Sequence, residues 1–142
     1  MNLYITLCAN LPENTIGKRI YKSRLELNLS QKELSVLCNI SRGAINMYEN
    51  DYIHPSRIVL YKLGTVLDLD YLCDDYSKLL LSNYIDQLKK WRIKNNFSMR
   101  KAAKFLEVPP NTYISWENGL YDIGINNYNK IKEKLLDILK EP

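Results

Sequence analysis

The chain has 142 residues, of which 46% are apolar, and it carries a formal net charge of +4. This length suits one ordinary core or two small cores of roughly 60 residues each, near the lower limit for independent stability. No run approaches the roughly 18 apolar residues of a membrane span, and the first fifteen residues lack the features of a secretory signal.

The first predicted element is an N-terminal arm, residues 1–15. Residues 3–7 alternate loosely between apolar and polar types, which fits either a strand that pairs with another chain or an arm packed on the helices. Apolar residues recur at helical spacing across 16–27, which predicts a first helix with Thr15 as its cap. Asn28 tolerates a left-handed conformation and is expected to end this helix.

Two short helices, separated by a turn of about three residues, are predicted next. Ser30 and Glu33 form a capping-box pattern that begins one helix, and Asn39 ends it. Ser41 caps the other helix, and the polar residues Asn50 and Asp51 end it. The residues expected to face the core are Leu34, Leu37 and Cys38 in one helix and Ala44, Ile45 and Tyr48 in the other. Such a pair of helices is a helix-turn-helix arrangement.

Two more helices complete the first half of the chain. The apolar run between Ile58 and Leu67 predicts a fourth helix, and residues 69–73 predict a short fifth. Residues 77–82 contain neither glycine nor proline, which argues against a loose linker and favours helices that abut.

The same pattern occurs again 68 residues later, without a gap. This offset aligns Lys22, Arg24, Asn28, Ser30, Glu49 and Asn50 with Lys90, Arg92, Asn96, Ser98, Glu117 and Asn118. A repeat of this length suits a small helical bundle. The sequence therefore predicts an all-α chain with two tandem domains, residues 16–75 and 82–142.

The charges are distributed unevenly along the chain. Residues 1–75 carry eight basic and nine acidic side chains, whereas residues 76–142 carry twelve and seven. Within the first half, residues 16–50 hold six basic and three acidic side chains, and an acidic segment follows. A basic body beside an acidic edge favours one-sided binding of a polyanion, although a solvated surface of mixed charge has the same composition.

No catalytic or metal site is predicted. Cys8, Cys38 and Cys73 lack the spacing of metal ligands, and their odd number favours buried free thiols in a cytoplasmic protein. His54 is the only histidine, and no carboxylate pair, nucleophile motif or glycine-rich phosphate loop accompanies it. We therefore expect neither an enzyme nor a cofactor-binding protein.

Residues 30–50, SQKELSVLCNISRGAINMYEN, resemble the Cro/CI-like (Xre) family of phage and bacterial repressors. Residues 98–119, SMRKAAKFLEVPPNTYISWENG, look like the same motif, and the resemblance extends over 16 to about 72 and about 84 to 139. It implies two lambda-repressor-like five-helix domains that bind double-stranded DNA. The expected function is a sequence-specific transcriptional regulator, most simply a repressor.

By this resemblance, the third helix of the first domain reads bases in the major groove. The expected base-reading residues are Arg42, Gly43, Ala44, Asn46 and Met47. Arg42 can donate two hydrogen bonds to guanine, Asn46 can pair with adenine, and Met47 can touch a thymine methyl group. The expected DNA-backbone contacts are Gln31, Ser41 and Asn50. The alternative for each residue is simple exposure to solvent.

The resemblance gives Arg24 a structural role. A basic side chain on the first helix suggests a DNA contact, yet its spacing resembles an internal salt bridge of the family. We therefore expect Arg24 to pair with Glu49, and Arg92 with Glu117 in the second copy.

The second copy departs from the family pattern. Met99 stands in place of the glutamine, and Pro109 and Pro110 occupy the turn and the start of the third helix. Proline is acceptable there, but the first base-reading side chain is lost. The remaining DNA candidates are Arg100, Asn111, Thr112, Ser115 and Asn118. They fit either phosphate binding with little sequence preference or a former reading domain that now serves docking or dimerisation.

A second function remains open for the whole chain. The same fold can hold a partner protein, as in an antitoxin-like regulator, and eleven tyrosines suit interfaces as well as cores. Homodimer formation is compatible with either function. Duplex affinity that depends on salt and on Arg42 distinguishes the DNA-reading function from the protein-binding one.

Overall fold

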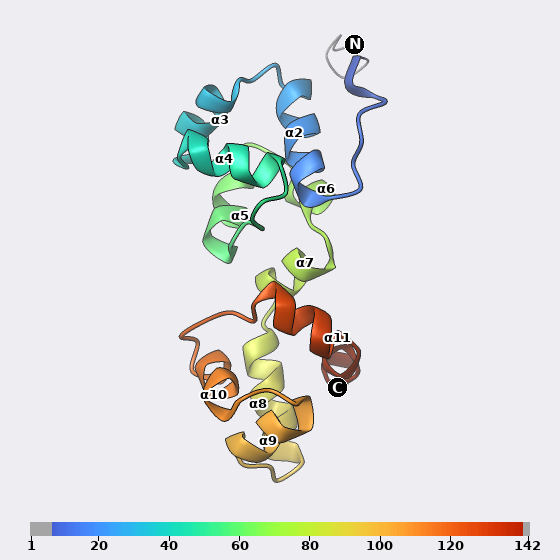
Figure 1. The fold of residues 1–142 in the computed structure, drawn as a ribbon, viewed down its shortest axis with the longest axis vertical. Helices are drawn as coiled ribbons and strands as arrows, with labels where there is room; N and C mark the ends of the chain where they lie inside the picture. The colour runs from blue at the N-terminus through green and yellow to red at the C-terminus, as the bar shows by residue number, and fades with distance from the viewer. Residues whose placement is uncertain (1–6, 141–142) are drawn as a thin grey trace. The chain divides into compact units, whose positions relative to one another are not determined.

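The computed structural model describes residues 7–140, and every element assigned within that range is a helix. The chain divides into two units between Lys78 and Leu79, and each unit is described by itself (Figure 1). The first unit contains α2 (Ile16–Glu26), α3 (Gln31–Cys38), α4 (Arg42–Glu49), α5 (Arg57–Leu63) and α6 (Leu69–Leu72). The second contains α8 (Tyr84–Lys94), α9 (Met99–Leu106), α10 (Pro110–Glu117) and α11 (Ile125–Lys140). A further helix, α7 (Asp75–Leu81), occupies the stretch between the two predicted domains.

Some of the expectations concern residues that are not described. The expected strand at residues 3–7 lies almost wholly outside the described residues. The domain boundaries at 75 and 82 stay a prediction.

The start of the first unit folds as its capping residues predict. Thr15 accepts a hydrogen bond from a backbone amide in the first turn of α2. Ser30 and Glu33 form both hydrogen bonds of a capping box at α3, and Ser41 caps α4. Side-chain oxygens thus satisfy amide groups that have no partner inside their own helices.

The repeat extends to the backbone. Residues in the left-handed region occur at three matched positions, and each pair is separated by the 68-residue offset. These pairs are Asn28 with Asn96, Asn39 with Glu107, and Asp51 with Gly119. Each residue reverses the chain just after a helix, so both units use the same three turns.

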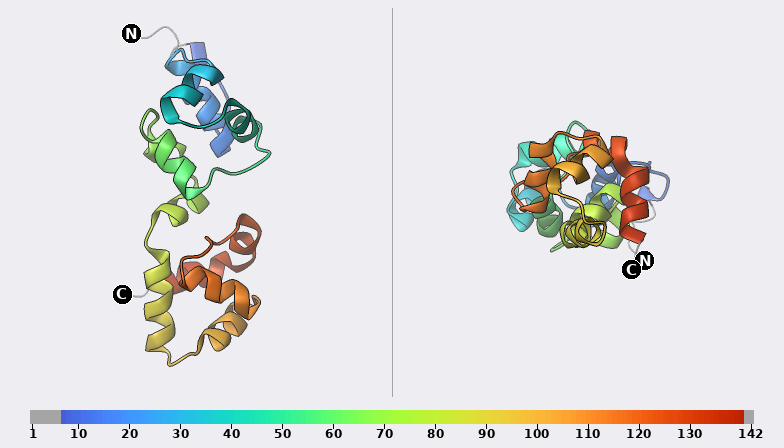
Figure 2. Two further views of the ribbon diagram at one scale, coloured as in Figure 1. Left: turned by 90° about the vertical axis from the view of Figure 1, so that its left-hand side faces the viewer. Right: turned by 90° about the horizontal axis from the view of Figure 1, so that it is seen from below.

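Each unit has its own apolar core. Side chains that are fully buried in the first unit include Ile20, Leu34, Ile45, Leu60, Leu63 and Leu72. Those in the second unit include Leu88, Ala102, Ala103, Tyr113, Ile123 and Leu135. In the second unit, α8 packs against α10 and α11, and Figure 2 shows these helices from two further sides. At Gly17, an added Cβ would collide with the carbonyl of Tyr48, so this glycine lets α2 approach the end of α4 closely.

Leu37, which the sequence places in the core, is exposed, and so is Ile58 of the apolar run that predicts the fourth helix. Leu37 is 56% exposed because Leu34 and Cys38 already form the narrow stripe by which α3 packs. Ile58 is 67% exposed because Leu60 and Leu63 form the buried side of α5. The fourth helix is also shorter than predicted and ends at Leu63, not near Leu67.

A buried ion pair joins the first and third helices of the first unit. The Arg24 guanidinium donates to Glu49 from Nη2 at 2.7 Å and from Nε at 2.9 Å, and the two side chains are 7% and 3% exposed. Arg24 Nη1 also donates to the carbonyl of Leu29 at 2.8 Å. One side chain therefore connects α2, the turn before α3 and the last turn of α4.

The second unit repeats this arrangement. Arg92 Nη2 donates to Glu117 at 2.6 Å, and Arg92 Nη1 donates to the carbonyl of Phe97 at 3.1 Å. The hydrogen bonds to Glu117 raise the pKa of Arg92. Burial alone would raise the pKa of Glu117, but the hydrogen bonds from Arg92 lower it below its ordinary value. The two predicted salt bridges are therefore formed.

Removal of Arg24 should destabilise the first unit strongly. Arg24→Met leaves the Glu49 carboxylate buried without a counter-charge, which costs about 3–5 kcal/mol of unfolding free energy. Urea denaturation followed by circular dichroism measures this loss. Trp91 and Trp116 lie in the second unit, so tryptophan fluorescence follows that unit separately.

The double variant Arg24→Met/Glu49→Leu is the control. It removes the stranded charge and should recover most of the loss. A single variant within about 0.5 kcal/mol of the wild type would contradict the structural role of the pair.

Candidate nucleic-acid interface

The outward face of α4 carries most of the predicted base-reading residues. Arg42, Gly43, Asn46 and Met47 are exposed on this helix, and Ala44 is half-buried. The opposite face buries Ile45, Tyr48 and Glu49 in the core. The capping residue Ser41 is exposed beside them at the start of the helix.

Arg42 projects without a counter-charge. Among residues 7–140, no carboxylate forms a salt bridge with its guanidinium. The basic residues of α2 differ: Lys22 pairs with Glu13 at 3.1 Å, and Arg19 donates to the carbonyl of Glu13 at 2.8 Å. These cations therefore hold the chain before α2 in place.

Gly43 has no packing role in the described structure. A Cβ added at this position would meet no atom within 4 Å, and its φ is not positive. Glycine inside a helix costs about 0.5–1 kcal/mol relative to alanine. The residue therefore leaves the backbone of α4 accessible at the cost of helix stability.

A hydrogen-bonded network supports Asn46. Gln31 Nε2 donates to Asn46 Oδ1 at 3.4 Å and to Glu49 Oε2 at 3.4 Å. Asn50 Nδ2 donates to Asn46 Oδ1 at 3.1 Å and to the Asn46 carbonyl at 2.8 Å. The structure thus joins one expected base reader to two expected backbone contacts. Sequence spacing could not reveal this network, because it depends on how α3 packs against α4.

The second unit presents a different surface at the matched positions. Asn111, Thr112 and Ser115 on α10 line one shallow hollow of about 350 Å³ together with Tyr121. Arg100 and Asn118 are exposed but do not line this hollow. Pro109 precedes α10 and supplies no side-chain cap. The hollow therefore combines amides and hydroxyls with the Trp116 ring and the Asp122 carboxylate, and the exposed Arg100 lies on a different helix.

A family comparison decides what these two helix pairs are. A sequence profile for helix-turn-helix proteins, HTH_3, matches residues 20–72 and 88–135. The chain belongs to the helix-turn-helix family. Each match contains one of the α3–α4 and α9–α10 pairs, so the two repeated units are two helix-turn-helix segments of the Cro/CI type.

One curated relative carries a name related to function. The chain is 40% identical over 57 residues to "Putative multi-protein-binding factor 1" of Yarrowia lipolytica. The aligned segment covers 40% of this chain and 38% of that protein. No solved structure matches the chain significantly.

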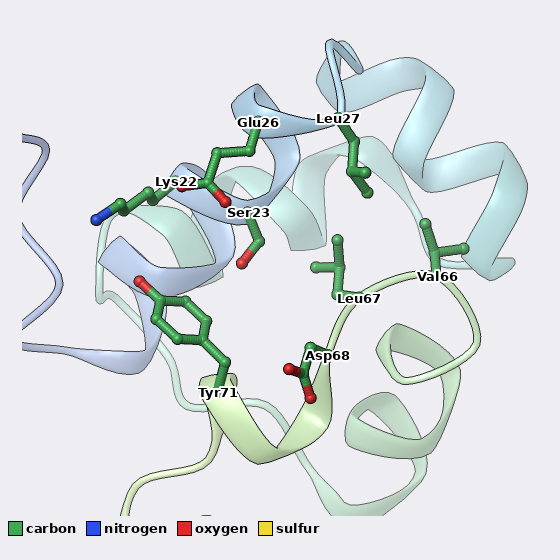
Figure 3. A pocket seen from close by; sticks show the side chains of 8 residues that line it. All are labelled: Lys22, Ser23, Glu26, Leu27, Val66, Leu67, Asp68 and Tyr71. Atoms are coloured by element: carbon green, nitrogen blue, oxygen red, sulfur yellow. The ribbon is translucent and has the colours of Figure 1, made fainter. Parts of the chain in front are cut away.

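The first unit also has a pocket of about 460 Å³, which is lined by side chains other than the expected DNA-contacting residues (Figure 3). It is lined by Lys22, Ser23, Glu26, Leu27, Val66, Leu67, Asp68 and Tyr71. Tyr71 Oη donates to Glu13 Oε2 at 2.5 Å, and hydrogen bonds from Tyr71 and Lys22 lower the pKa of that carboxyl. None of the lining residues belongs to α3 or α4, so the pocket is separate from the expected reading surface.

His54 has a structural environment. Its Nε2 lies 3.1 Å from Asp74 Oδ2 and 3.2 Å from Ser77 Oγ, and its Nδ1 lies 2.8 Å from the carbonyl of Pro55. Ser77 is fully buried, so it is not accessible to a substrate. The cluster connects the loop after α4 to the start of α7.

Residues 7–140 contain no group of three or more His, Cys, Asp or Glu side chains placed to hold a metal ion. Cys8, Cys38 and Cys73 are buried thiols, and burial raises the pKa of Cys38 and Cys73. In the part of the chain that the structure describes, no helix is long and apolar enough to cross a membrane.

The His54 cluster should stabilise the fold in a pH-dependent way. Burial alone would raise the pKa of Asp74, but hydrogen bonds from His54 and Ser77 lower it from 3.8 to about 2. A carboxyl with a lowered pKa contributes its full stability above its ordinary value, and it loses this contribution as the pH falls toward the lowered one. Asp74→Asn should therefore be less stable than the wild type at pH 7. The difference in unfolding free energy between the two proteins should disappear as the pH falls from 3.8 to about 2.

Urea denaturation of both proteins at several pH values measures this gap. Other carboxyl groups are common to both chains, so the difference isolates Asp74. Parallel stability curves down to pH 2 would contradict the role of the cluster.

Proposed function

We propose that the chain is a sequence-specific, double-stranded-DNA-binding transcriptional regulator, most simply a cytoplasmic repressor. The proposal rests above all on Arg42, an exposed cation that forms no salt bridge with residues 7–140 and lies at the start of the second helix of a helix-turn-helix motif. In this proposal α4 enters the major groove, and the chain has no catalytic function.

The dimensions of B-form DNA fit this role. The major groove is about 12 Å wide and accepts one α-helix, and a helix-turn-helix reads bases from the first residues of its second helix. Arg42 would donate two hydrogen bonds to guanine O6 and N7, and Met47 and Ala44 would contact thymine methyl groups. The open space over Gly43 supports a close approach of the α4 backbone to DNA. Gln31, Ser41 and Asn50 would position the motif on the phosphate backbone.

Two roles are compatible with the second unit. Arg100, Asn111, Thr112, Ser115 and Asn118 would bind phosphate groups with little sequence preference. Alternatively, the unit would serve docking or homodimer formation, since its reading helix begins with prolines. Under either role the first unit supplies most of the sequence discrimination.

Substitution of Arg42 tests the proposal. A preferred duplex is first selected from a random pool with the wild-type chain, and affinity is then measured by gel retardation at several salt concentrations. Arg42→Ala should weaken binding to that duplex about 5- to 150-fold, equivalent to about 1–3 kcal/mol, by removal of a two-hydrogen-bond contact.

Arg42→Lys is the matched control because it keeps the positive charge but loses the planar fork of the guanidinium. It should retain the salt dependence of binding while it discriminates less at one base pair. Equal affinities of all three proteins, or no retardation of any duplex, would refute the proposal.

A second candidate function is the binding of a partner protein. Two observations favour it: the pocket between α2 and the α5–α6 region, and the relative from Yarrowia lipolytica, which is named as a multi-protein-binding factor. Leu27 at this pocket is 49% exposed and would contact an apolar side chain of the partner.

The second candidate predicts that a protein co-purifies with the chain and is lost from the Leu27→Asp variant. Leu136→Asp is a suitable control, because Leu136 on α11 is 46% exposed and lies outside the pocket. Equal retention by both variants would exclude the pocket as the binding site. Unchanged duplex binding by Leu27→Asp would show that the two activities are separate.

A further inference from the structure

The polarity of the hydrogen bonds around Asn46 can be deduced from a carboxylate. Glu49 is held by Arg24, and an ionised carboxylate only accepts hydrogen bonds. The Gln31 amide lies 3.4 Å from Glu49 Oε2. If this amide were reversed, its oxygen would face the carboxylate oxygen without a proton between them. Gln31 must therefore present its NH₂ group to Glu49.

The same argument then orients Asn46. Gln31 Nε2 also points to the Asn46 amide, and Asn50 Nδ2 approaches that amide from within the same helix. Both neighbours are donors, so the atom of Asn46 that they contact must be the oxygen. A carbonyl oxygen has two lone pairs, and these two donors use both. The Asn46 Nδ2 group is left with its two hydrogens for other partners.

We propose that Asn46 contacts DNA only as a hydrogen-bond donor and therefore selects a base with acceptors on its major-groove edge, guanine in preference to the others. This inference rests on the proposed DNA-binding function and names the base class read by one residue. Guanine presents two acceptors, N7 and O6, whereas the cytosine edge presents an N4 donor that would face the Asn46 donor.

The proposal differs from the adenine contact that the sequence predicts. Pairing of asparagine with adenine requires the side-chain oxygen to accept from adenine N6 while Nδ2 donates to N7. In this structure that oxygen is already engaged by Gln31 and Asn50. Gln31 is thus a positioning residue, and the Arg24–Glu49 pair determines its orientation.

The second unit lacks the amide network of Gln31 and Asn46. The 68-residue offset places Met99 at the position of Gln31 and Ile114 at the position of Asn46. The Arg92–Glu117 ion pair is retained there, but Met99 and Ile114 have no amide group that this pair could orient. The inference therefore concerns the first unit only.

The test selects preferred duplexes from a random pool with the full-length wild type, Asn46→Asp and Gln31→Met. Asn46→Asp keeps the size and shape of the side chain, and one carboxylate oxygen can still accept from Gln31 and Asn50. The outward atom changes from a donor to an acceptor. Preference at one base position should change from guanine to cytosine or adenine by roughly tenfold or more, and other positions should keep their preference.

Gln31→Met provides a second, independent readout. It removes one of the two donors while it keeps a side chain of similar length, so the Asn46 oxygen regains a lone pair that can accept from adenine N6. Preference at the same base position should broaden to include adenine, whereas general weakening would affect all positions alike. Asn129→Asp changes an exposed asparagine on α11 and should leave the selected sequence unchanged.

The outcomes separate this inference from the function on which it depends. A wild-type sequence with adenine at the position that responds to Asn46→Asp would overturn the inference and leave the DNA-binding function intact. So would the absence of any base position that responds to Asn46→Asp. Failure of the wild type to enrich any duplex would overturn both.

Discussion

The geometry of each unit depends on one arginine–glutamate pair, which is buried in the first unit and partly buried in the second. In the first unit, Arg24 connects α2, the turn before α3 and the end of α4 through hydrogen bonds at 2.7–2.9 Å. Because the charges are buried, loss of either partner strands the other, so the packing of α4 cannot shift without a large cost. The pair also influences the surface, because Glu49 accepts a hydrogen bond from the Gln31 amide and thereby orients Gln31 and then Asn46.

The two copies retain their scaffold and differ at their surface. The left-handed turns, the ion pair and its contact with a turn carbonyl recur at the 68-residue offset. So does a lysine contact with the carbonyl at the turn of the motif, made by Lys62 and by Lys130. The reading positions differ, since Pro110 replaces Arg42 and Ile114 replaces Asn46. A shared fold therefore does not imply a shared ligand.

The sequence predicted the features that depend on local chemistry. Ser30, Glu33 and Ser41 act within one helical turn, so the capping residues located α3 and α4 correctly. Periodicity was less reliable in helices of about two turns, where Leu37 and Ile58 fit an apolar stripe but lie in solvent. The α7 helix and the Gln31–Asn46–Asn50 network were missed. The network depends on the contact of Gln31 with Asn46, which lies 15 residues away. The α7 helix has a local signal that was overlooked, because the Ser77 backbone amide donates to Asp74 Oδ1 at 2.7 Å.

DNA binding and protein binding need not exclude each other in this chain. The expected reading surface is formed by α3 and α4, whereas the pocket is formed by side chains of α2, α6 and the segment before α6. Lys22 lines the pocket and is neutralised by Glu13, with 3.1 Å between Nζ and Oε2. The exposed Arg42 has no such neighbour among residues 7–140. In the first unit, Lys22 is thus paired with a carboxylate, whereas Arg42 is not paired with one in the described part of the chain. Because no pocket residue belongs to α3 or α4, a duplex bound to α4 would leave the pocket residues accessible.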